Sequence, residues 1–227
     1  MKLALSILFT FVGLSFPSQA QDSPWHDGLY SQYDFNSFVE LAIAQREMDF
    51  KNIDYPLLNA AVFYETNRMR KKKRLPVFQH SAKLEEAAFG HSTDMVERNF
   101  YGHNSKVRGK KTVKDRLALV GLTNLGLAEN VAQTFALQMS EKNSYYLPSQ
   151  NGGYFSLSYR GEPVPAHTYL SFAKSLVKEW MDSPGHRANI LDKSFTHLGC
   201  GIRYNTPKKQ DDFPMFMATQ NFGTRGE

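Results

Sequence analysis

The sequence contains a single cysteine among its 227 residues, Cys200, so no internal disulfide can form. Stability must therefore come from a hydrophobic core, and about 200 residues suffice for one domain that buries about 70% of its unfolded surface. The sequence also lacks an HExxH zinc helix, a GxSxG nucleophile elbow, a glycine-rich phosphate loop and a CxxC pair. Histidines and carboxylates are the side chains that remain as candidates for chemistry.

Long apolar runs are absent beyond the first twenty residues. Lys2, the mostly apolar run 3–14 and the small residues Ser18 and Ala20 predict a cleavable signal peptide over residues 1–20. The apolar run is too short for a stable membrane anchor. The sequence therefore predicts an exported protein, secreted or periplasmic, with no transmembrane segment after signal removal.

Acidic residues are fewer than basic ones, which leaves a net charge of +5. Much of this charge comes from the run Arg70-Lys71-Lys72-Lys73-Arg74. Such a run invites a nucleic-acid interpretation, but export argues against it. The run follows an amphipathic helix, where cations favour the negative end of the helix dipole and stay solvated. We therefore expect a solvated helix end and no nucleic-acid partner.

Apolar periodicity and punctuation by proline and glycine divide the chain into expected elements. Residues 21–53 are expected to form an N-terminal arm with a short helix, and 54–225 one domain without internal repeats. The turn-rich segment 138–167 is expected to be an insertion. Within the domain the pattern predicts helices over about 56–70, 81–99, 112–120 and 169–181, and strands over 198–204 and 213–222.

Small residues around Cys200 predict close packing of its strand. Gly199 and Gly201 flank the cysteine in an apolar stretch, and such glycines mark the close approach of another backbone. We expect a helix to lie against this strand, and Cys200 to be an inert thiol in the core.

Three side chains are candidates for a site. Pro184 and Gly185 end a helix, so His186 is expected on the turn that follows it. His103 lies in the irregular stretch 100–109, and Glu129 interrupts an apolar stretch, where a carboxylate needs partners. Either Glu129 bonds backbone amides and pins a loop, or it supports chemistry. The trio can bind a divalent ion or act as acid and base, whereas His91, on an apolar helix face, is expected to be a core residue.

Six segments in order resemble the CAP superfamily, the domain shared by cysteine-rich secretory proteins, antigen 5 and pathogenesis-related 1 proteins, in its bacterial SCP-like form. The resemblance covers about residues 57–223. It implies an α+β fold, a three-layer α-β-α sandwich with a mostly antiparallel sheet between helices, and a large central cleft. The matching segments are LNAAVFYETNRMR at 58–70, AAFGHSTDMVERNFYGHNS at 87–105, AENVA at 128–132, VKEWMDSPGHRANIL at 177–191, HLGCGI at 197–202 and TQNFG at 219–223.

In the family this cleft is lined by two histidines and two glutamates. By motif, His103, Glu129 and His186 resemble three of them. The second glutamate does not carry over, because Ser183 stands three positions after Trp180, and the neighbouring Glu179 and Asp182 are expected on different helix faces. Asn104 and Arg187, beside the two histidines, complete the predicted binding cleft, and His103 and His186 are the predicted metal ligands.

The function predicted from the resemblance is binding of an envelope or extracellular ligand or partner in this cleft, with a divalent metal such as zinc as a candidate cofactor. The 138–167 insertion is expected near the cleft. A metal-dependent, peptidase-like hydrolase with Glu129 as base is the alternative; enzymatic activity stays open, because a fold does not confer it. Lipid or sterol binding is a third possibility, in a groove formed by aromatics of the insertion. The sequence leaves the ligand and the oligomeric state open.

Overall fold

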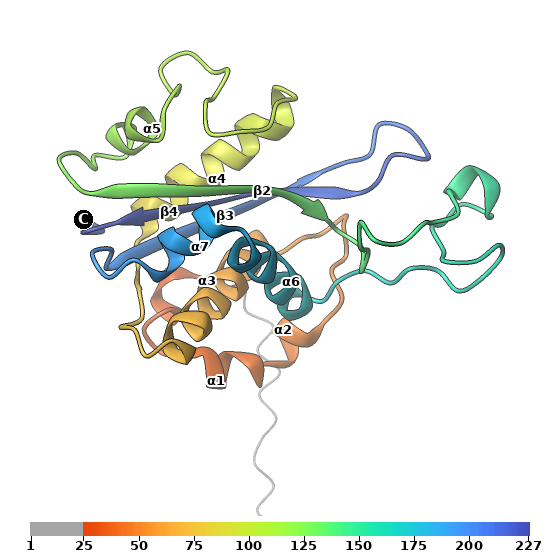
Figure 1. Cartoon of the computed structure of the whole chain (residues 1–227), viewed down its shortest axis with the longest axis horizontal. Coiled ribbons are helices and arrows are strands. Elements are labelled where there is room, and N and C mark those ends of the chain that lie inside the picture. Colours follow the sequence, from red (N-terminus) through yellow and green to blue (C-terminus); the bar gives the residue numbers. More distant parts are fainter. Residues whose placement is uncertain (1–24) are drawn as a thin grey trace, which may run out of the picture.

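The computed structural model describes residues 25–227 and shows three layers, with a four-stranded sheet between helices (Figure 1). The predicted signal peptide, residues 1–20, lies outside the described residues. One face of the sheet is covered by α4 (Ala82–Glu97) and α5 (Val113–Leu119), and the other by α3 (Tyr55–Lys72), α6 (Tyr169–Asp182) and α7 (Pro184–Leu191). The α-β-α sandwich expected from the resemblance is confirmed.

The sheet has the strand order β1-β3-β4-β2. The long strands β2 (Leu127–Phe135), β3 (His197–Asn205) and β4 (Met215–Gly223) pair antiparallel, and only the short β1 (Gln79–His80) runs parallel to β3. The sheet is therefore mixed but mostly antiparallel, as expected. Within the described residues β2 is an outer strand, so loops and helices from both layers can reach its free edge.

The helix boundaries follow from capping residues. The side chain of Asp54 accepts a hydrogen bond from the Leu57 amide, and Pro56 occupies the first turn of α3, where its missing N–H costs no helical bond. Ser81 caps α4 in the same way. The short helix expected within residues 21–53 is instead two short helices, α1 (Phe35–Val39) and α2 (Ala42–Gln45). A capping box of Asp34 and Ser37 begins the first of them.

Residues that precede α3 contribute to the main core. Trp25, Leu29 and Phe38 are buried there, and the Trp25 ring packs edge-on against Phe38 and Tyr64 at centroid distances of 5.3 and 5.9 Å. The segment expected as an arm is thus packed against α3 by aromatic contacts. Its boundary with the domain at residues 53 and 54 stays a prediction.

The α4 helix lies directly on β3, as the glycines around Cys200 predict. A Cβ atom added to Gly199 would lie 2.0 Å from the Glu85 amide nitrogen, and one on Gly201 would lie 2.0 Å from that of Phe89. Cys200 between them is fully buried, and burial raises the pKa of its thiol well above the ordinary value. The expectation of an inert core thiol is confirmed.

Arg70 departs from the solvated helix end expected for the basic run. Its side chain is buried and stacks on the Phe78 ring, with the guanidinium carbon 3.8 Å from the ring centroid. Its Nη1 donates to the carbonyls of Ile190 and Asp192 at 2.8 and 2.7 Å. The prediction was wrong for Arg70 because this arginine caps the carbonyl end of α7. The next four basic residues, 71–74, are exposed as expected.

The 138–167 segment projects beyond the end of the sheet, beside the loop that joins β3 to β4 (Figure 1). The two are tied by Ser149, whose amide and hydroxyl donate to Asp211 at 2.8 and 2.6 Å, and by Phe155 stacked on Phe213 at 5.0 Å. The segment follows Phe135, about 20 Å along β2 from Glu129 at about 3.3 Å per residue. Its predicted role at the entrance of the site stays a prediction.

His167 makes the fold sensitive to acid. Its side chain is buried against Phe172, and burial lowers its pKa to about 4. An unfolded histidine has a pKa of about 6.5, so the unfolded chain takes up this proton first as the pH falls. The stabilisation is complete above about pH 6.5 and is lost on the way to pH 4, on the order of 3 kcal/mol. Urea unfolding at pH 7 and pH 4 measures this loss.

The control for this prediction is a histidine that is exposed in the same structure. His167→Gln is expected to lose less stability between pH 7 and pH 4 than the wild type does. His26→Gln, at an exposed position, is expected to follow the wild type. Equal losses in all three proteins would contradict the role given to His167.

Candidate functional site

His186 lies in a helix and not on the turn predicted for it. The α6 helix ends at Asp182 as Pro184 requires, but Pro184 also begins α7, so that His186 is the third residue of a new helix. Ser183 alone separates the two helices and caps both. The turn prediction was wrong because proline is favoured in the first turn of a helix, where no N–H is needed. A helical frame now presents the histidine.

Two asparagines attach α7 to β2. The Asn130 side chain donates to the His186 carbonyl at 3.2 Å, and its own Oδ1 accepts from the Asn189 amide at 2.9 Å. Asn189 also donates to the Glu129 carbonyl at 3.4 Å. Asn130 is fully buried, so these bonds form in the protein interior, where unmade bonds are costly. They place His186 beside the strand that carries Glu129.

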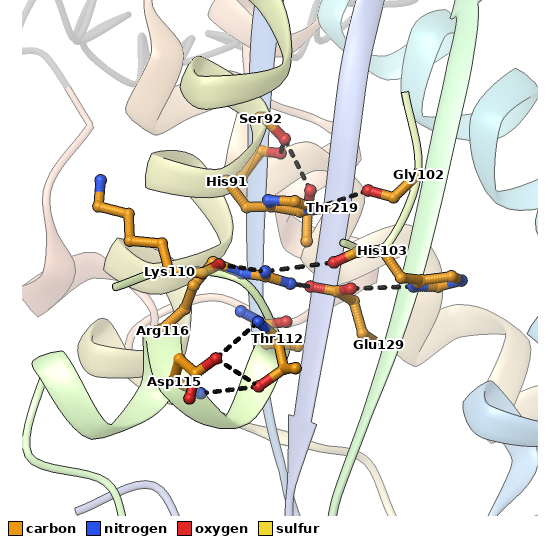
Figure 2. A network of polar contacts seen from close by, with 12 residues as sticks. His91, Ser92, Gly102, His103, Lys110, Thr112, Asp115, Arg116, Glu129 and Thr219 are labelled. Atoms are coloured by element: carbon orange, nitrogen blue, oxygen red, sulfur yellow. Dashed lines mark hydrogen bonds and ion pairs between the residues drawn. The ribbon is translucent and has the colours of Figure 1, made fainter. Parts of the chain in front are cut away.

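Glu129 is buried, with 3% of its side chain exposed, and both of its oxygens have partners. Oε1 accepts from His103 Nδ1 at 2.9 Å, and Oε2 accepts from Arg116 Nη2 at 2.5 Å. Figure 2 shows Arg116, Glu129 and His103 joined in a row. Of the two alternatives left open for Glu129, bonding to backbone amides is not what the structure shows, because a buried carboxylate is better matched by a full positive charge, which Arg116 supplies.

Sequence reasoning missed Arg116, the cation that balances this carboxylate. Its side chain is 2% exposed, and its Nη1 donates to the carbonyls of His103, Lys110 and Lys111 at 3.2, 3.0 and 3.3 Å. A capping box between Thr112 and Asp115 fixes the first turn of α5 and so the position of Arg116 (Figure 2). The only available signal was the need of Glu129 for a cationic partner.

The ring of His103 is exposed, but its Nδ1 atom is bonded to the buried carboxylate of Glu129. The side chain is 57% exposed, and the hydrogen bond to Glu129 is the main cause that raises its pKa. Because an ionised carboxylate only accepts, Nδ1 carries the proton in this bond. Glu129 thus holds Nδ1 in a fixed orientation, and Nε2 is the ring nitrogen that can meet a ligand.

His103 and His186 approach the outer strand β2 from different layers, and their charges interact. Desolvation lowers the pKa of the half-buried His186, and the nearby positive charge of His103 lowers it further. The structure therefore brings together the three side chains predicted from the sequence. His91 donates from Nε2 to the carbonyl of Gly102 at 3.0 Å and is fully buried, so it is a core residue that secures the loop before His103, as expected.

The two flanking residues of the predicted cleft are exposed. The Arg187 Nη1 atom donates to the carbonyl of Met181 at 2.9 Å, so this arginine also caps the end of α6. Asn104 follows His103 on the exposed loop. Their participation in binding stays a prediction.

Of the two carboxylates considered in place of the missing glutamate, Glu179 faces the sheet. Its Oε1 accepts from the Thr134 hydroxyl on β2 at 2.7 Å, and its pKa is raised, chiefly by desolvation. Its charge also contributes to the raised pKa of Tyr101. Asp182 instead pairs with Lys178 on the exposed side of α6. Glu129 lies near the start of β2, whereas Glu179 of α6 contacts the strand near its end, at Thr134. Four strand residues separate Glu129 from Thr134.

A site with three or more protein ligands for a metal is absent from residues 25–227. Both oxygens of Glu129 are already bonded, so the residues that can hold an ion are the two imidazoles, His103 through Nε2 and His186. The Glu129–His103 hydrogen bond does resemble the carboxylate support that metal-binding histidines use. An ion held by these two imidazoles would have two protein ligands, which is fewer than the usual catalytic or structural zinc site provides.

The model of the cysteine-rich secretory protein family (CAP) matches residues 125–222, which include β2, α6, α7, β3 and most of β4. This match confirms the resemblance inferred from the motifs over residues 125–222.

Two relatives from Bacillus subtilis share the similarity. The uncharacterized membrane protein YlbC is 29% identical over 137 residues, which cover 60% of this chain and 29% of YlbC. The uncharacterized protein YkwD is 28% identical over 136 residues, which cover 60% of this chain and 38% of YkwD. The chain thus spans about a third of the length of these curated relatives. In this chain, no helix among residues 25–227 is long and apolar enough to cross a membrane.

Solved bacterial structures also superpose on the chain. An extracellular protein containing an SCP domain from Bacillus anthracis does so with a TM-score of 0.48 and 24% identity, covering 74% of this chain and 40% of that one. An outer surface protein from Borrelia burgdorferi gives a TM-score of 0.47 and 15% identity, covering 80% of this chain and 98% of that one.

Proposed function

We propose that this protein is an exported binding protein, which holds a ligand of the envelope or the extracellular space on the imidazoles of His103 and His186. Export rests on the predicted signal peptide. The observation that supports the binding function is the exposed ring of His103. Its orientation is fixed by a hydrogen bond to the buried carboxylate of Glu129, whose charge is neutralised by the buried Arg116.

The energetics of this arrangement support binding. Burying an arginine and a glutamate together costs desolvation that their attraction only roughly offsets, so the pair is a poor device for stability alone. What the pair accomplishes is orientation, because it holds one exposed imidazole in a single direction beside a second one. Such support of a contacting side chain by a fixed layer beneath it is typical of binding sites.

Binding is favoured over hydrolysis by the same contacts. A general base must be able to reach the proton that it removes, and the Glu129 carboxylate is only 3% exposed. The two oxygens of Glu129 instead face His103 and Arg116, and the only thiol of the chain, Cys200, is buried. A screen of peptide and ester pools is expected to give no turnover that Glu129→Gln abolishes, and such turnover would favour the hydrolase instead.

A divalent metal ion is the ligand that can be tested first. His103 and His186 would hold it, and the ion would act as a Lewis acid that attracts an anionic or carbonyl group of a partner molecule. Calorimetric titration with zinc is expected to show one saturable site in the wild type. His103→Ala and His186→Ala are each expected to weaken it at least about tenfold, since each removes half of the protein ligands, and the double variant is expected to abolish it.

The control for the zinc titration is His26→Ala, which removes an exposed histidine elsewhere and is expected to leave the heats unchanged. Identical heats for the wild type and the double variant would remove the metal from the proposal. The binding function itself is tested by the NMR signals of both imidazoles during titration with zinc, short peptides and envelope glycan fragments. If none of these probes moves either signal, the proposed function is wrong.

A further inference from the structure

A second site is formed by a pocket of about 910 Å³ between the segment before α1, one face of α3 and the residues that lead into β1. None of its lining residues belongs to the His103, Glu129 and His186 set. Its volume lies in the range of small-molecule sites. Part of its wall precedes residue 54, so the pocket exists only because the N-terminal segment packs on the domain.

Apolar surface forms most of the pocket wall, with six aromatic lining residues, and several of the polar atoms between them already have partners. Asn67 exchanges two hydrogen bonds with the backbone of Phe78, at 2.7 and 3.0 Å. The hydroxyl of Tyr30 and Nε2 of His80 both bond Glu85, at 2.9 and 2.8 Å. A ligand in the pocket therefore meets chiefly ring faces and hydrocarbon. The aromatic lining residues are Tyr30, Tyr33, Phe35, Phe63, Tyr64 and Phe78.

Charged side chains of both signs lie around this apolar wall, and the basic lining residues outnumber the acidic ones by three to two. Lys71 and Lys72 line the pocket and are exposed. Lys72 takes part in none of the ion pairs formed by residues 25–227. Two acidic residues also line the pocket. The carboxylate of Asp34 caps α1 by accepting from the Ser37 amide at 3.0 Å, whereas Asp27 is exposed and takes part in none of the ion pairs formed by the described residues.

We propose that this pocket binds a small amphiphile with an apolar body and an anionic head group. The body would lie against the aromatic wall, where burial of apolar surface supplies the affinity. The head group would face Lys71 and Lys72. The ligand can be a free amphiphile, such as a fatty acid, or a lipid that presents the same chemistry from a membrane surface. This site is independent of the function proposed for His103 and His186.

The fluorescence of Trp25 can report ligand binding in this pocket. The Trp25 ring packs against three lining residues, Tyr30 at 5.7 Å, Tyr33 at 5.6 Å and Tyr64 at 5.9 Å. The other tryptophan, Trp180, is buried beneath β2. Tryptophan fluorescence is titrated with decanoate, decanol and decyltrimethylammonium below their micelle-forming concentrations. We expect a saturable change for decanoate, with a dissociation constant about tenfold lower than for the cationic amphiphile, because the head group meets two exposed lysines. No saturable change with decanoate, or equal affinity for the three head groups, would overturn the proposal.

Two neighbouring lysines supply a matched pair of variants. Lys72 lines the pocket and Lys73 does not, although both are exposed. Lys72→Glu is expected to weaken decanoate binding several-fold and to favour the cationic amphiphile, whereas Lys73→Glu, with the same change in net charge, is expected to leave both affinities unchanged. Equal effects of the two substitutions would show a general charge effect and contradict the assignment of the pocket.

A second pair of variants tests the apolar wall. Val77 is 53% exposed at the pocket, and Leu157 is 62% exposed on the 138–167 segment. Val77→Asp is expected to weaken decanoate binding and Leu157→Asp is not; the reverse order would locate the amphiphile elsewhere. Sedimentation with phosphatidylglycerol vesicles then identifies the source. Co-sedimentation that Val77→Asp abolishes supports a membrane lipid as ligand, and decanoate binding without co-sedimentation supports a free amphiphile.

Discussion

Replacing Glu129 by glutamine is expected to lower the free energy of unfolding by about 3–5 kcal/mol, which is the usual cost of leaving one charge of a buried pair without its partner. The affected charge is the guanidinium of Arg116, which is 2% exposed and keeps only its carbonyl partners in the variant. Urea unfolding at pH 7 measures the loss. In the same variant the pKa of His103 is expected to fall, because its hydrogen bond to the carboxylate is the main cause of its raised value.

The control for this prediction is a carboxylate whose ion pair is exposed. Asp182 pairs with Lys178 on the surface of α6, with 66% and 74% of the two side chains exposed. Asp182→Asn is expected to cost less than about 1 kcal/mol, since solvent screens such pairs. If Glu129→Gln cost no more than Asp182→Asn, the buried pair would not have the role given to it here.

Replacing Gly201 by alanine is expected to cost about 3 kcal/mol, at the upper end of the range for overpacked cores. The new methyl carbon would lie 2.0 Å from the amide nitrogen and 2.3 Å from the Cα of Phe89, so the backbone of α4 must move away from the sheet. A flexible side chain could rotate away, but a helix backbone cannot. Thermal and urea unfolding give the loss in stability.

Gly90 provides the matched control on the helix itself. A Cβ atom there meets nothing within 4 Å, so Gly90→Ala is expected to raise stability by up to about 1 kcal/mol through the better helix propensity of alanine. The two substitutions add the same methyl group, one on β3 against the backbone of α4 and the other on α4 where nothing lies within 4 Å. A small or stabilising effect of Gly201→Ala would contradict the close approach of α4 and β3.

The fold could be predicted from the sequence wherever the signal is local. Pro56 after Asp54 marked the start of α3, and Ser81 marked that of α4, because capping depends on residues within one turn. Gly199 and Gly201 predicted the contact with a helix, though not which helix. Local signals failed at Pro184, which ends one helix and begins another, because a proline is compatible with both.

The sequence predicted which residues form the candidate site but not the contacts that hold them in place. His103, Glu129 and His186 were found by motif. Arg116 was missed because it is joined to Glu129 only when α5 packs over β2, and no spacing in the chain reveals that contact. Arg70 was placed in solvent for the same kind of reason, since its carbonyl partners belong to residues about 120 positions later in the chain.

By itself, the sequence determined the main helices, two of the long strands and the buried thiol, and it proposed the three polar residues of the candidate site, because periodicity, caps and residue chemistry act over short distances. Only the tertiary structure decided which cation neutralises Glu129, which histidine nitrogen is presented and where a large pocket forms. These features depend on pairs of distant segments, such as residues 27–36 against α3. Their contacts arise from packing between layers, which no local pattern encodes.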